Sequence, residues 1–418
     1  MSWLVPENEL TPEQLRAIRL GPEENRAIVG GPGSGKTQIL LYRARFLKDK
    51  HRIFPAKFRV LVYTNVLKDY IRSALPLLGL PDECVLTFDH WCRLFYEEHI
   101  GRTLPWDATH KTPDFAAIRQ AVAALIENRK VKLPLYDFVL VDEGQDLDIG
   151  VFNLLSKIAK HVTVCLDSKQ KIYDTDSNEQ SILSVLGIQR RNISLIDAFR
   201  VCPYLVRLAS VLIPEQGERD AFVNQARTEQ VERQMPFLYL ADSYADEKEK
   251  LFQMIRERQL KNDSIAILFP INKQVFGYAQ GLKEAGIEVE VPQKGKTKGK
   301  IPTHDFGSSR PKLMSYHSAK GLTFDSVFMP RLTSRAFEFT RQSQERISKL
   351  LFVAITRATK WVFISTDKKD MLDVIRDKML PMESTGQIFV GRMGQNVRGS
   401  QPSKIPEIET ENDPLDFL

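Results

Sequence analysis

The chain of 418 residues has few cysteines, and the four that it has, Cys84, Cys92, Cys165 and Cys202, show no Cys-x-x-Cys spacing. This scatter predicts buried free thiols and argues against a zinc cage or an iron–sulfur cluster. Long apolar runs are also lacking, since none approaches the roughly 20 residues of a membrane helix. The start of the chain lacks a basic-then-apolar secretion pattern. We therefore expect a cytoplasmic protein that has no membrane partner.

A strong charge of one sign is absent as well. The formal net charge is only +6, from 59 basic and 53 acidic residues, and 43% of the residues are hydrophobic. This small basic excess permits a polyanionic partner but does not identify one. The hydrophobic content is normal for a chain that buries a core, and the length allows two or three domains.

A glycine-rich loop lies between an apolar run at 27–29 and a helix-like pattern that begins at Gln38. The loop reads Gly-x4-Gly-Lys-Thr, the sequence of a phosphate-binding loop that precedes a helix. The predicted nucleotide-binding residues are Gly30, Gly31, Pro32, Gly33, Ser34, Gly35, Lys36, Thr37 and Gln38. Glycines let backbone N–H groups point at phosphate, Lys36 supplies positive charge, and the Thr37 hydroxyl suits magnesium. The alternative is an ordinary glycine-rich turn before a helix.

An acidic pair follows a second apolar run. Residues 138–141 are Phe-Val-Leu-Val, which is typical of a central parallel strand, and Asp142 and Glu143 come directly after it. Asp142 is suited to hold magnesium, and Glu143 to act as the general base for the attacking water. Together with the phosphate loop, this pair predicts a site that hydrolyses a nucleotide.

The segment Asp-Glu-Gly-Gln-Asp at 142–146 resembles the acidic box of the UvrD/Rep-like helicases of superfamily 1. Other motifs of that family are found in the same order along the chain. Residues 10–14, Leu-Thr-Pro-Glu-Gln, are similar to the family's adenine-reading segment, which implies that Gln14 pairs with the adenine of ATP. The resemblance thus implies ATP and Mg²⁺ as the ligands of the site.

Two further segments, 59–65 and 87–91, are similar to family motifs that contact nucleic acid. The residues they imply as contacts are Thr64, Asn65, Thr87 and Phe88. Asp89 stands where the family usually has histidine, which leaves that contact without a matching residue. Trp91 fits either this motif or a position in the core.

The segment 162–173 resembles a family motif in which Gln170 senses the terminal phosphate and Tyr173 stacks on a base. Leu166 and Thr175 depart from its usual glycine and second aromatic residue. The missing aromatic residue removes one stacking platform. We therefore expect a weaker or differently arranged grip on single strands.

Later motifs complete the resemblance. Residues 316–325, Tyr-His-Ser-Ala-Lys-Gly-Leu-Thr-Phe-Asp, imply that His317 and Ser318 contact nucleic acid and that Gly321 lies at the nucleotide. Residues 195–200 and 351–358 match motifs that imply arginine fingers at Arg200 and Arg357. Thr323 replaces a family glutamate that contacts the ribose, so relaxed nucleotide selectivity is expected.

The resemblance implies an α/β fold with two tandem RecA-like P-loop NTPase domains whose parallel sheets are flanked by helices, and the alternation of strand and helix patterns supports it. We predict a first domain at 1–195 with a short helical insertion at 92–136, a second domain at 196–395 and a disordered acidic tail at 396–418. In the second domain, strands are predicted at 264–269 and 286–291 around a helix at 273–285. The room between 292 and 312 is too short for the family's second accessory domain, and its lysines at 294–300 are a candidate phosphate contact.

The predicted function is an ATP-dependent translocase or helicase on single-stranded DNA, for which the resemblance implies 3′-to-5′ polarity, and RNA stays open as the track. The alternative is a nucleic-acid-sensing ATPase switch that acts through a protein partner, bound at the tail or in place of the missing accessory domain. A P-loop kinase or GTPase is a third possibility, but it would not account for the motifs that follow the acidic box.

Overall fold

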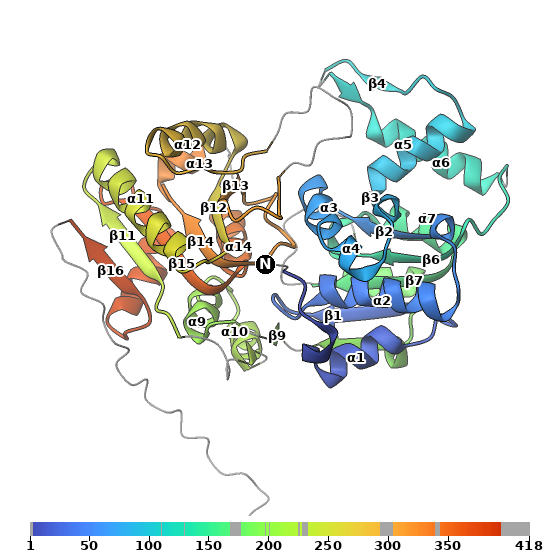
Figure 1. The fold of residues 1–418 in the computed structure, drawn as a ribbon, viewed down its shortest axis with the longest axis horizontal. Helices are drawn as coiled ribbons and strands as arrows, with labels where there is room; N and C mark the ends of the chain where they lie inside the picture. Colours follow the sequence, from blue (N-terminus) through green and yellow to red (C-terminus); the bar gives the residue numbers. More distant parts are fainter. Residues whose placement is uncertain are drawn as a thin grey trace, which may run out of the picture.

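The computed structural model describes residues 3–109, 111–128, 130–167, 177–196, 198–199, 201–224, 226–227, 233–292, 304–338 and 343–393. They form two six-stranded sheets, each flanked by helices, and the two halves lie side by side in Figure 1. This confirms the predicted α/β class with tandem parallel sheets. The predicted lysine loop at 294–300 and the predicted tail at 396–418 lie outside the described residues.

The first sheet has the strand order β3-β2-β6-β7-β1-β8, and every pairing in it is parallel. Its strands are β1 (Arg26–Gly30), β2 (Phe58–Val62), β3 (Val85–Thr87), β6 (Tyr136–Val141), β7 (Ala159–Leu166) and β8 (Ile193–Ile196). Its helices are α1 (Pro12–Arg19), α2 (Lys36–Lys50), α3 (Asn65–Arg72), α4 (Leu75–Leu78), α5 (Phe88–His99), α6 (Phe115–Glu127), α7 (Ile149–Ile158) and α8 (Glu179–Val185). Strand β6 buries nearly every residue, as an interior strand covered on both faces should.

The second sheet has the order β13-β12-β14-β15-β11-β16, again with parallel pairings throughout. Its strands are β11 (Phe237–Ala241), β12 (Ile265–Phe269), β13 (Lys312–Ser315), β14 (Phe324–Met329), β15 (Ala358–Asp367) and β16 (Phe389–Arg392). Its helices are α9 (Pro203–Ser210), α10 (Gln216–Asn224), α11 (Tyr244–Leu260), α12 (Asn272–Glu284), α13 (Ser334–Glu338) and α14 (Gln344–Ile355). The exact domain boundary stays a prediction, although the first sheet's last strand ends at Ile196.

Short elements complete the chain. The small strands are β4 (Trp106–Asp107) paired with β5 (Thr112–Pro113), and β9 (Ala198–Phe199) paired with β10 (Ala226–Arg227). Single turns lie at Glu7–Glu9, Pro55–Lys57, Asp82–Cys84, Gly144–Asp146, Arg190–Asn192, Ile375–Met379 and Leu380–Glu383.

The predicted strand at 286–291 is wrong. Only Glu290 pairs with the sheet, through an isolated bridge to Lys312. The chain leaves α12 through Gly286, whose φ is +75°, and Ile287 N donates back to Leu282 O at 2.9 Å. This helix-ending turn occupies the backbone that a strand would need. The predicted strand at 264–269 and helix at 273–285 are confirmed by β12 and α12.

The predicted helical insertion contains α5, α6 and the small β4–β5 pair, which extend from the first sheet in Figure 1. Trp91 at the start of α5 is only 3% exposed, and its Nε1 donates to Tyr136 Oη at 2.7 Å. Trp91 is therefore a core residue. The four cysteines are free and buried, as their scatter predicts.

One hydrophobic cluster runs through both halves. It contains Leu40 of α2 in the first half and Leu268 and Leu351 in the second. At its surface the Tyr70 ring of α3 stacks on Trp3, with ring centroids 4.2 Å apart, and meets the edge of Phe306 at 5.1 Å. The two sheets thus share apolar surface. None of the described helices has the length and apolar character needed to cross a bilayer.

A polar network lies inside the first half. Arg43 of α2 is fully buried, and its Nη2 lies 3.1 Å from Nε2 of His161 on β7. The same imidazole nitrogen lies 2.8 Å from the hydroxyl of Thr163. A nitrogen that accepts from a guanidinium carries no proton, so this contact requires neutral histidine. Burial, followed by the charge of Arg43, lowers the pKa of His161 to about 3.

Phe138→Ala tests how much the buried core of the first sheet contributes to the stability of the fold. Phe138 is fully buried in β6 and stacks on Phe58 with centroids 4.8 Å apart. Removing the ring leaves a cavity, so urea unfolding should show a loss of about 3–5 kcal/mol. The control is Phe54→Ala, because Phe54 is 77% exposed, and it should change stability by no more than about 0.5 kcal/mol. Equal effects of the two variants would contradict this account of the core.

His161→Gln tests the buried imidazole. The unfolded chain binds a proton at His161 near pH 6.5, whereas the folded chain binds it only near pH 3. Stability from this group is therefore complete above pH 6.5 and falls as the pH drops, by up to about 1.4 kcal/mol per pH unit. Unfolding free energies measured between pH 7 and 5 should fall more steeply for the wild type than for the variant. Parallel pH profiles would contradict the buried neutral histidine.

Candidate active site

The phosphate loop joins β1 to α2 at the carboxyl end of the first sheet. Gly33 and Gly35 have φ of +75° and +79°, a region that residues with a side chain rarely adopt. At Gly30 a Cβ would lie 2.7 Å from Ile196 O, so only glycine fits there. At Gly31 a Cβ would meet nothing within 4 Å, and Pro32, which follows it, is buried. The loop therefore curls as the sequence predicts.

Several polar groups at the loop suit a phosphate and its cation. Ser34 Oγ and Gln38 Nε2 are buried and have no hydrogen-bond partner among the described residues. The Thr37 hydroxyl donates to Asp142 Oδ2 at 2.6 Å. This brings together the two oxygen groups that we expect to hold magnesium, a hard cation that prefers oxygen ligands. The donor set thus fits the predicted ligands.

Lys36 closes back on the loop that precedes it. Its Nζ donates to Gly30 O at 2.7 Å and to Gly31 O at 3.0 Å, and it pairs with Asp167 Oδ2 at 3.1 Å. Asp167 comes directly after β7, the strand next to β1 in the sheet. The ammonium group is thereby held over the loop, where a phosphate group would meet it.

The two carboxylates at the end of β6 differ in environment. Burial and the neighbouring Glu143 charge raise the pKa of Asp142 to about 6. Burial also acts to raise the pKa of Glu143, but nearby Lys320, Lys36 and Arg357 outweigh it and lower that pKa. The Glu143 carboxylate therefore stays ionised at neutral pH, as a general base must. Its backbone has φ of +52°, which turns the side chain out of the strand direction.

Gln145 ties this turn to the neighbouring strand. Its Nε2 donates to Glu143 Oε2 at 2.5 Å, and its Oε1 accepts from the backbone N–H of Asp167 at 3.0 Å. Both amide ends are used, so the Glu143 carboxylate has a fixed orientation. Gly144 packs against β7, where a Cβ would come within 2.4 Å of Val164. The Gly-Gln pair therefore orients the candidate base.

Cations of the second half reach these carboxylates. Lys320 Nζ lies 2.6 Å from Asp146 Oδ2 and 3.9 Å from Glu143 Oε2, and its side chain is 2% exposed. Burial raises the pKa of Asp146 to about 7, while Lys320 acts to lower it. Arg357 is 4% exposed, and the charges of Glu143, Asp167 and Asp142 act on it across the interface. The site is thus built from both sheets.

Arg357 is held by its own half. Its Nε donates to Val353 O at 3.0 Å and its Nη1 to Leu322 O at 3.3 Å. Gly321, with φ of +78°, lies against the first half, because a Cβ there would come within 2.9 Å of Leu67 and 3.5 Å of Glu143 Oε1. The predicted residues Gly321 and Arg357 are therefore brought to the candidate base.

Gln14 lies beside the phosphate loop on α1. Its Oε1 accepts from Thr11 N at 3.0 Å in a capping box, and its Nε2 donates to Ser34 O at 3.1 Å. A glutamine amide has two N–H groups and two lone pairs, so one of each is left for a ligand. One donor and one acceptor are what the N7 and N6 edge of adenine requires.

Four predicted nucleic-acid contacts lie at neighbouring strand ends. Thr64 comes shortly after β2, and Thr87 is the last residue of the parallel strand β3. Their hydroxyls accept from Leu67 N and His90 N at the starts of α3 and α5. Asn65 is exposed, whereas Phe88 is 5% exposed and packs on Trp91. The Phe88 ring therefore anchors α5 in the core, and its contact with nucleic acid stays a prediction.

Asp89 has a different partner from the one its motif suggested. Arg119 of α6 lies 3.6 Å from Asp89 Oδ1 and 3.9 Å from Asp148 Oδ2. Asp89 therefore faces the insertion helix, and Arg119 links that helix to the turn after the acidic box.

The remaining predicted residues divide into described and undescribed ones. His317 is half-buried near Arg346 and Lys320, and burial followed by these two charges lowers its pKa. The Ser318 hydroxyl lies 2.9 Å from Ser315 Oγ. Gln170, Tyr173 and Arg200 lie outside the described residues.

Sequence reasoning assigned no role to Gln145, Asp146, Asp167 or Lys320. All four stand inside motifs that the sequence did reveal, at 142–146, 162–173 and 316–325. The sequence could not show which of these residues contact one another. Lys320 and Asp146 form an ion pair although they are far apart in the chain and lie in different halves of the molecule.

Comparisons with known proteins agree with this geometry. A family model described as an AAA domain matches residues 14–176, and one described as a UvrD-like helicase C-terminal domain matches residues 303–369. The two matches cover the phosphate loop and acidic box in one half and the Lys320 and Arg357 motifs in the other.

Two curated relatives bear provisional names as DNA helicases. One, from Mycoplasma pneumoniae, is 24% identical over 247 residues, 54% of this chain and 43% of the relative. The other, from Acanthamoeba polyphaga mimivirus and named as ATP-dependent, is 22% identical over 393 residues, 85% of this chain and 53% of the relative. The chain thus spans about half the length of these relatives.

Among solved structures, the C-terminal domain of a possible DNA helicase from Lactobacillus plantarum matches 46% of this chain over 98% of its own length. The identity is 12% and the TM-score 0.34, so this match adds nothing to the fold described above.

Lys320→Met and Asp146→Asn test the ion pair between the sheets. Removing the lysine leaves two buried carboxylates without their cation, which should cost about 3–5 kcal/mol in unfolding free energy. The double variant should lose less than the sum of the single variants, with a coupling of about 1–3 kcal/mol.

The control is Lys349→Met, since Lys349 pairs with Glu345 at 2.7 Å on the exposed face of α14. Exposed pairs contribute little, so this variant should unfold nearly as the wild type does. Additive losses in the double variant, or equal losses for the two lysines, would contradict the buried pair.

Proposed function

We propose that this chain, which belongs to the UvrD-like helicases of superfamily 1, hydrolyses ATP between its two sheets to move along single-stranded DNA in the 3′-to-5′ direction. The observation that carries the proposal is the meeting of Lys320 and Arg357 of the second half with Glu143 and Asp146 of the first. A site divided between two bodies can couple chemistry to their relative motion.

The first half supplies binding and the base. We infer that the loop N–H groups and Lys36 receive the phosphates of ATP and that Gln14 reads the adenine. Thr37 and Asp142 would hold Mg²⁺, which neutralises phosphate charge when bound. Glu143, kept ionised by its cationic neighbours, accepts a proton from the attacking water.

The second half supplies positive charge. Arg357, together with Arg200, would stabilise the charge that develops on the transferred phosphoryl oxygens. Gln170 would report the presence of the terminal phosphate. Because Gly321 lies against Glu143 and Leu67, a small change at the base is transmitted to the segment that carries His317 and Ser318. This segment is the proposed route from hydrolysis to the track.

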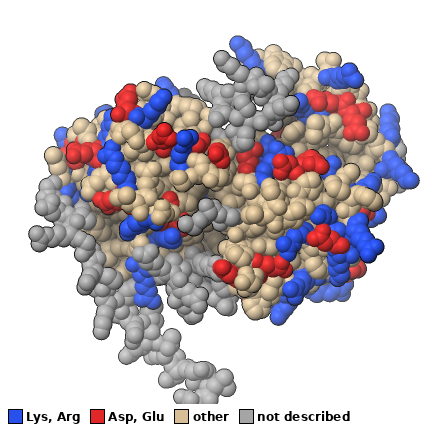
Figure 2. Space-filling model, viewed as in Figure 1, with Lys and Arg blue, Asp and Glu red and all other residues tan. Residues whose placement is uncertain are grey.

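The proposed track crosses the ends of β2 and β3 at Thr64, Asn65 and Thr87, with His317 and Ser318 in the other half and Tyr173 stacking on a base. On the face shown in Figure 2, basic and acidic side chains are interspersed over both halves. We therefore expect binding to depend on specific backbone contacts and base stacking more than on a general positive field. The names of the two relatives favour DNA over RNA.

No feature of the described residues favours the alternative, a nucleotide-switched subunit that acts through a protein partner. The candidate base has an ionised carboxylate and a fixed orientation, which a site built only for binding does not need. The motor is therefore the function that the site supports best.

Glu143→Gln tests the proposal directly. Loss of the general base should lower kcat for ATP by about 10²–10⁴-fold while ATP binding persists. Steady-state hydrolysis is measured with and without mixed-sequence single-stranded DNA or RNA. Strong stimulation of the wild type by one polymer, absent in the variant, identifies the track. The matched control is Glu98→Gln, because Glu98 is 74% exposed on α5.

Polarity is read from the same preparations by displacement of streptavidin from biotin at either end of an oligonucleotide. Faster displacement at the 5′ end supports 3′-to-5′ movement. ATP binding without stimulation by either polymer would rule out the motor and point to the switched subunit.

A further inference from the structure

Arg43 is the largest side chain that is fully buried among the described residues. It lies on α2, about two turns after Lys36. A buried guanidinium must have its donors satisfied, since an unpaired buried charge is very costly. Its hydrogen bonds go to main-chain carbonyls, a hydroxyl and an imidazole, and these partners belong to other elements of the first half.

One side of the guanidinium caps helix α1. Nη1 donates to Leu20 O at 2.6 Å, to Ile18 O at 3.2 Å and to Ala17 O at 3.4 Å. These carbonyls belong to the last turn of α1, where backbone acceptors have no partner within the helix. A cation at this end also complements the helix dipole. Arg43 therefore fixes the carboxyl end of α1.

The other side of the guanidinium is anchored to the sheet. Nε donates to Thr163 Oγ1 at 2.9 Å, and Nη2 lies 3.1 Å from His161 Nε2. Both partners are on β7, which pairs with β1 beneath the phosphate loop. Burial lowers the pKa of Arg43 to about 10, so the guanidinium stays charged at neutral pH. The arginine is thus a rigid brace between α1, α2 and the sheet.

The amino end of α1 carries Gln14. Its amide oxygen accepts a hydrogen bond from Thr11 N, and its amide nitrogen donates one to Ser34 O of the phosphate loop. Helix α1 is therefore tied to the phosphate loop at one end and to Arg43 at the other. A helix of eight residues has little stability of its own, so its position depends on such ties. The position of this short helix therefore sets the direction of the remaining N–H group and lone pair of Gln14.

We propose that Arg43 is a positioning residue for base recognition: it holds α1 so that the free N–H group and lone pair of Gln14 meet the adenine of ATP. The inference rests on the proposed function, because it takes ATP as the ligand. Arg43 itself lies at the far end of α1 and acts only through Gln14. A shift of about 1 Å at the glutamine would break hydrogen bonds whose geometry is narrow.

The test compares ATP with purine riboside triphosphate, which lacks the exocyclic amine of adenine. Equilibrium binding to the full chain is measured by calorimetry in the presence of Mg²⁺, and kcat is measured in parallel. The wild type should bind ATP about tenfold more tightly than the analogue, as expected for one lost hydrogen bond. Arg43→Lys keeps the charge but loses the forked geometry. It should weaken the binding of ATP about tenfold more than the binding of the analogue, because ATP loses its contacts at N7 and N6 whereas the analogue has only N7 to lose. The preference should therefore fall close to one.

A merely structural arginine gives a different result. If Arg43 has only a structural role, Arg43→Lys should weaken the binding of both nucleotides equally, or lower kcat for both, and the preference for ATP should remain. That outcome overturns the proposal. A wild type without any preference for ATP overturns it as well. If Arg43→Lys does not fold, Thr163→Val removes one anchor only and should lower the same preference by a smaller factor. An unchanged preference in a folded Thr163→Val variant then counts against the brace.

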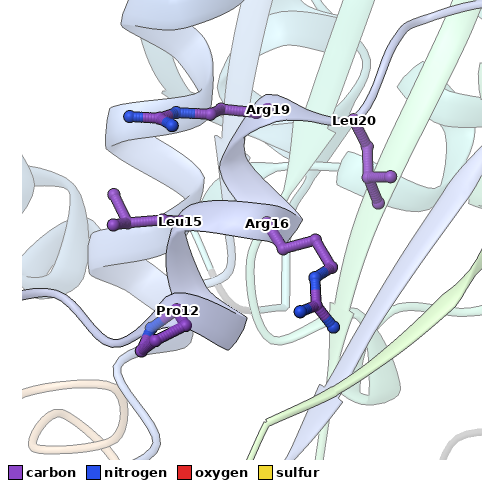
Figure 3. A pocket seen from close by; sticks show the side chains of 5 residues that line it. All are labelled: Pro12, Leu15, Arg16, Arg19 and Leu20. Atoms are coloured by element: carbon purple, nitrogen blue, oxygen red, sulfur yellow. The ribbon is translucent and has the colours of Figure 1, made fainter.

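The matched control is Arg19→Met. Arg16 and Arg19 project from the same helix, where they line a shallow surface pocket with Pro12, Leu15 and Leu20 (Figure 3). Arg19 is exposed, and its loss should leave both affinities unchanged. The proposed function fails separately: ATP bound with the expected preference but never hydrolysed, with or without nucleic acid, would refute the motor and leave the brace intact.

Discussion

The contact between Lys320 and Asp146 is the constraint on which the rest of the site depends. Both side chains are nearly free of solvent, at 2% and 0% exposure, and they come from different sheets. A buried ion is tolerated only with its counter-ion in place. The two halves must therefore approach until the lysine reaches the carboxylate, and the Gly321 backbone then packs on Leu67 with no room for a Cβ. Closure of the cleft is thus an electrostatic requirement as much as an apolar one.

The charges between the two halves form one interacting set. Asp142, Glu143, Asp146 and Asp167 belong to the first half, and its own Lys36 neutralises only part of them. Lys320 and Arg357 across the interface add two more positive charges. Phosphate groups placed over Lys36 would compete for the same cations. In our proposal, nucleotide binding and release therefore change how strongly the halves attract each other, which is what a motor requires.

Local parts of this structure could be predicted from sequence, and contacts between distant segments could not. The phosphate loop, strand β6 and the acidic box follow from residues adjacent in the chain, so their patterns sufficed. The strand predicted at 286–291 does not form, because the turn at Gly286 that ends helix α12 uses the N–H group of Ile287 for a hydrogen bond back to the helix. The partner of Asp89, Arg119, lies in the insertion, where no family motif guides the prediction. Lys320 was visible in its motif, but only the fold shows that it meets Asp146.

In our proposal, base recognition uses the first half alone and hydrolysis uses both halves, and this difference has a mechanical consequence. Gln14, α1 and Arg43 are all tied to the first half, to the phosphate loop and to β7. The hydrolytic groups, by contrast, are shared between the halves. In our proposal, opening of the two halves would separate Arg357 and Lys320 from the carboxylates but would leave the adenine site whole. The nucleotide could then stay bound to one half while the other moves, and hydrolysis rather than base binding would be the step that the track controls.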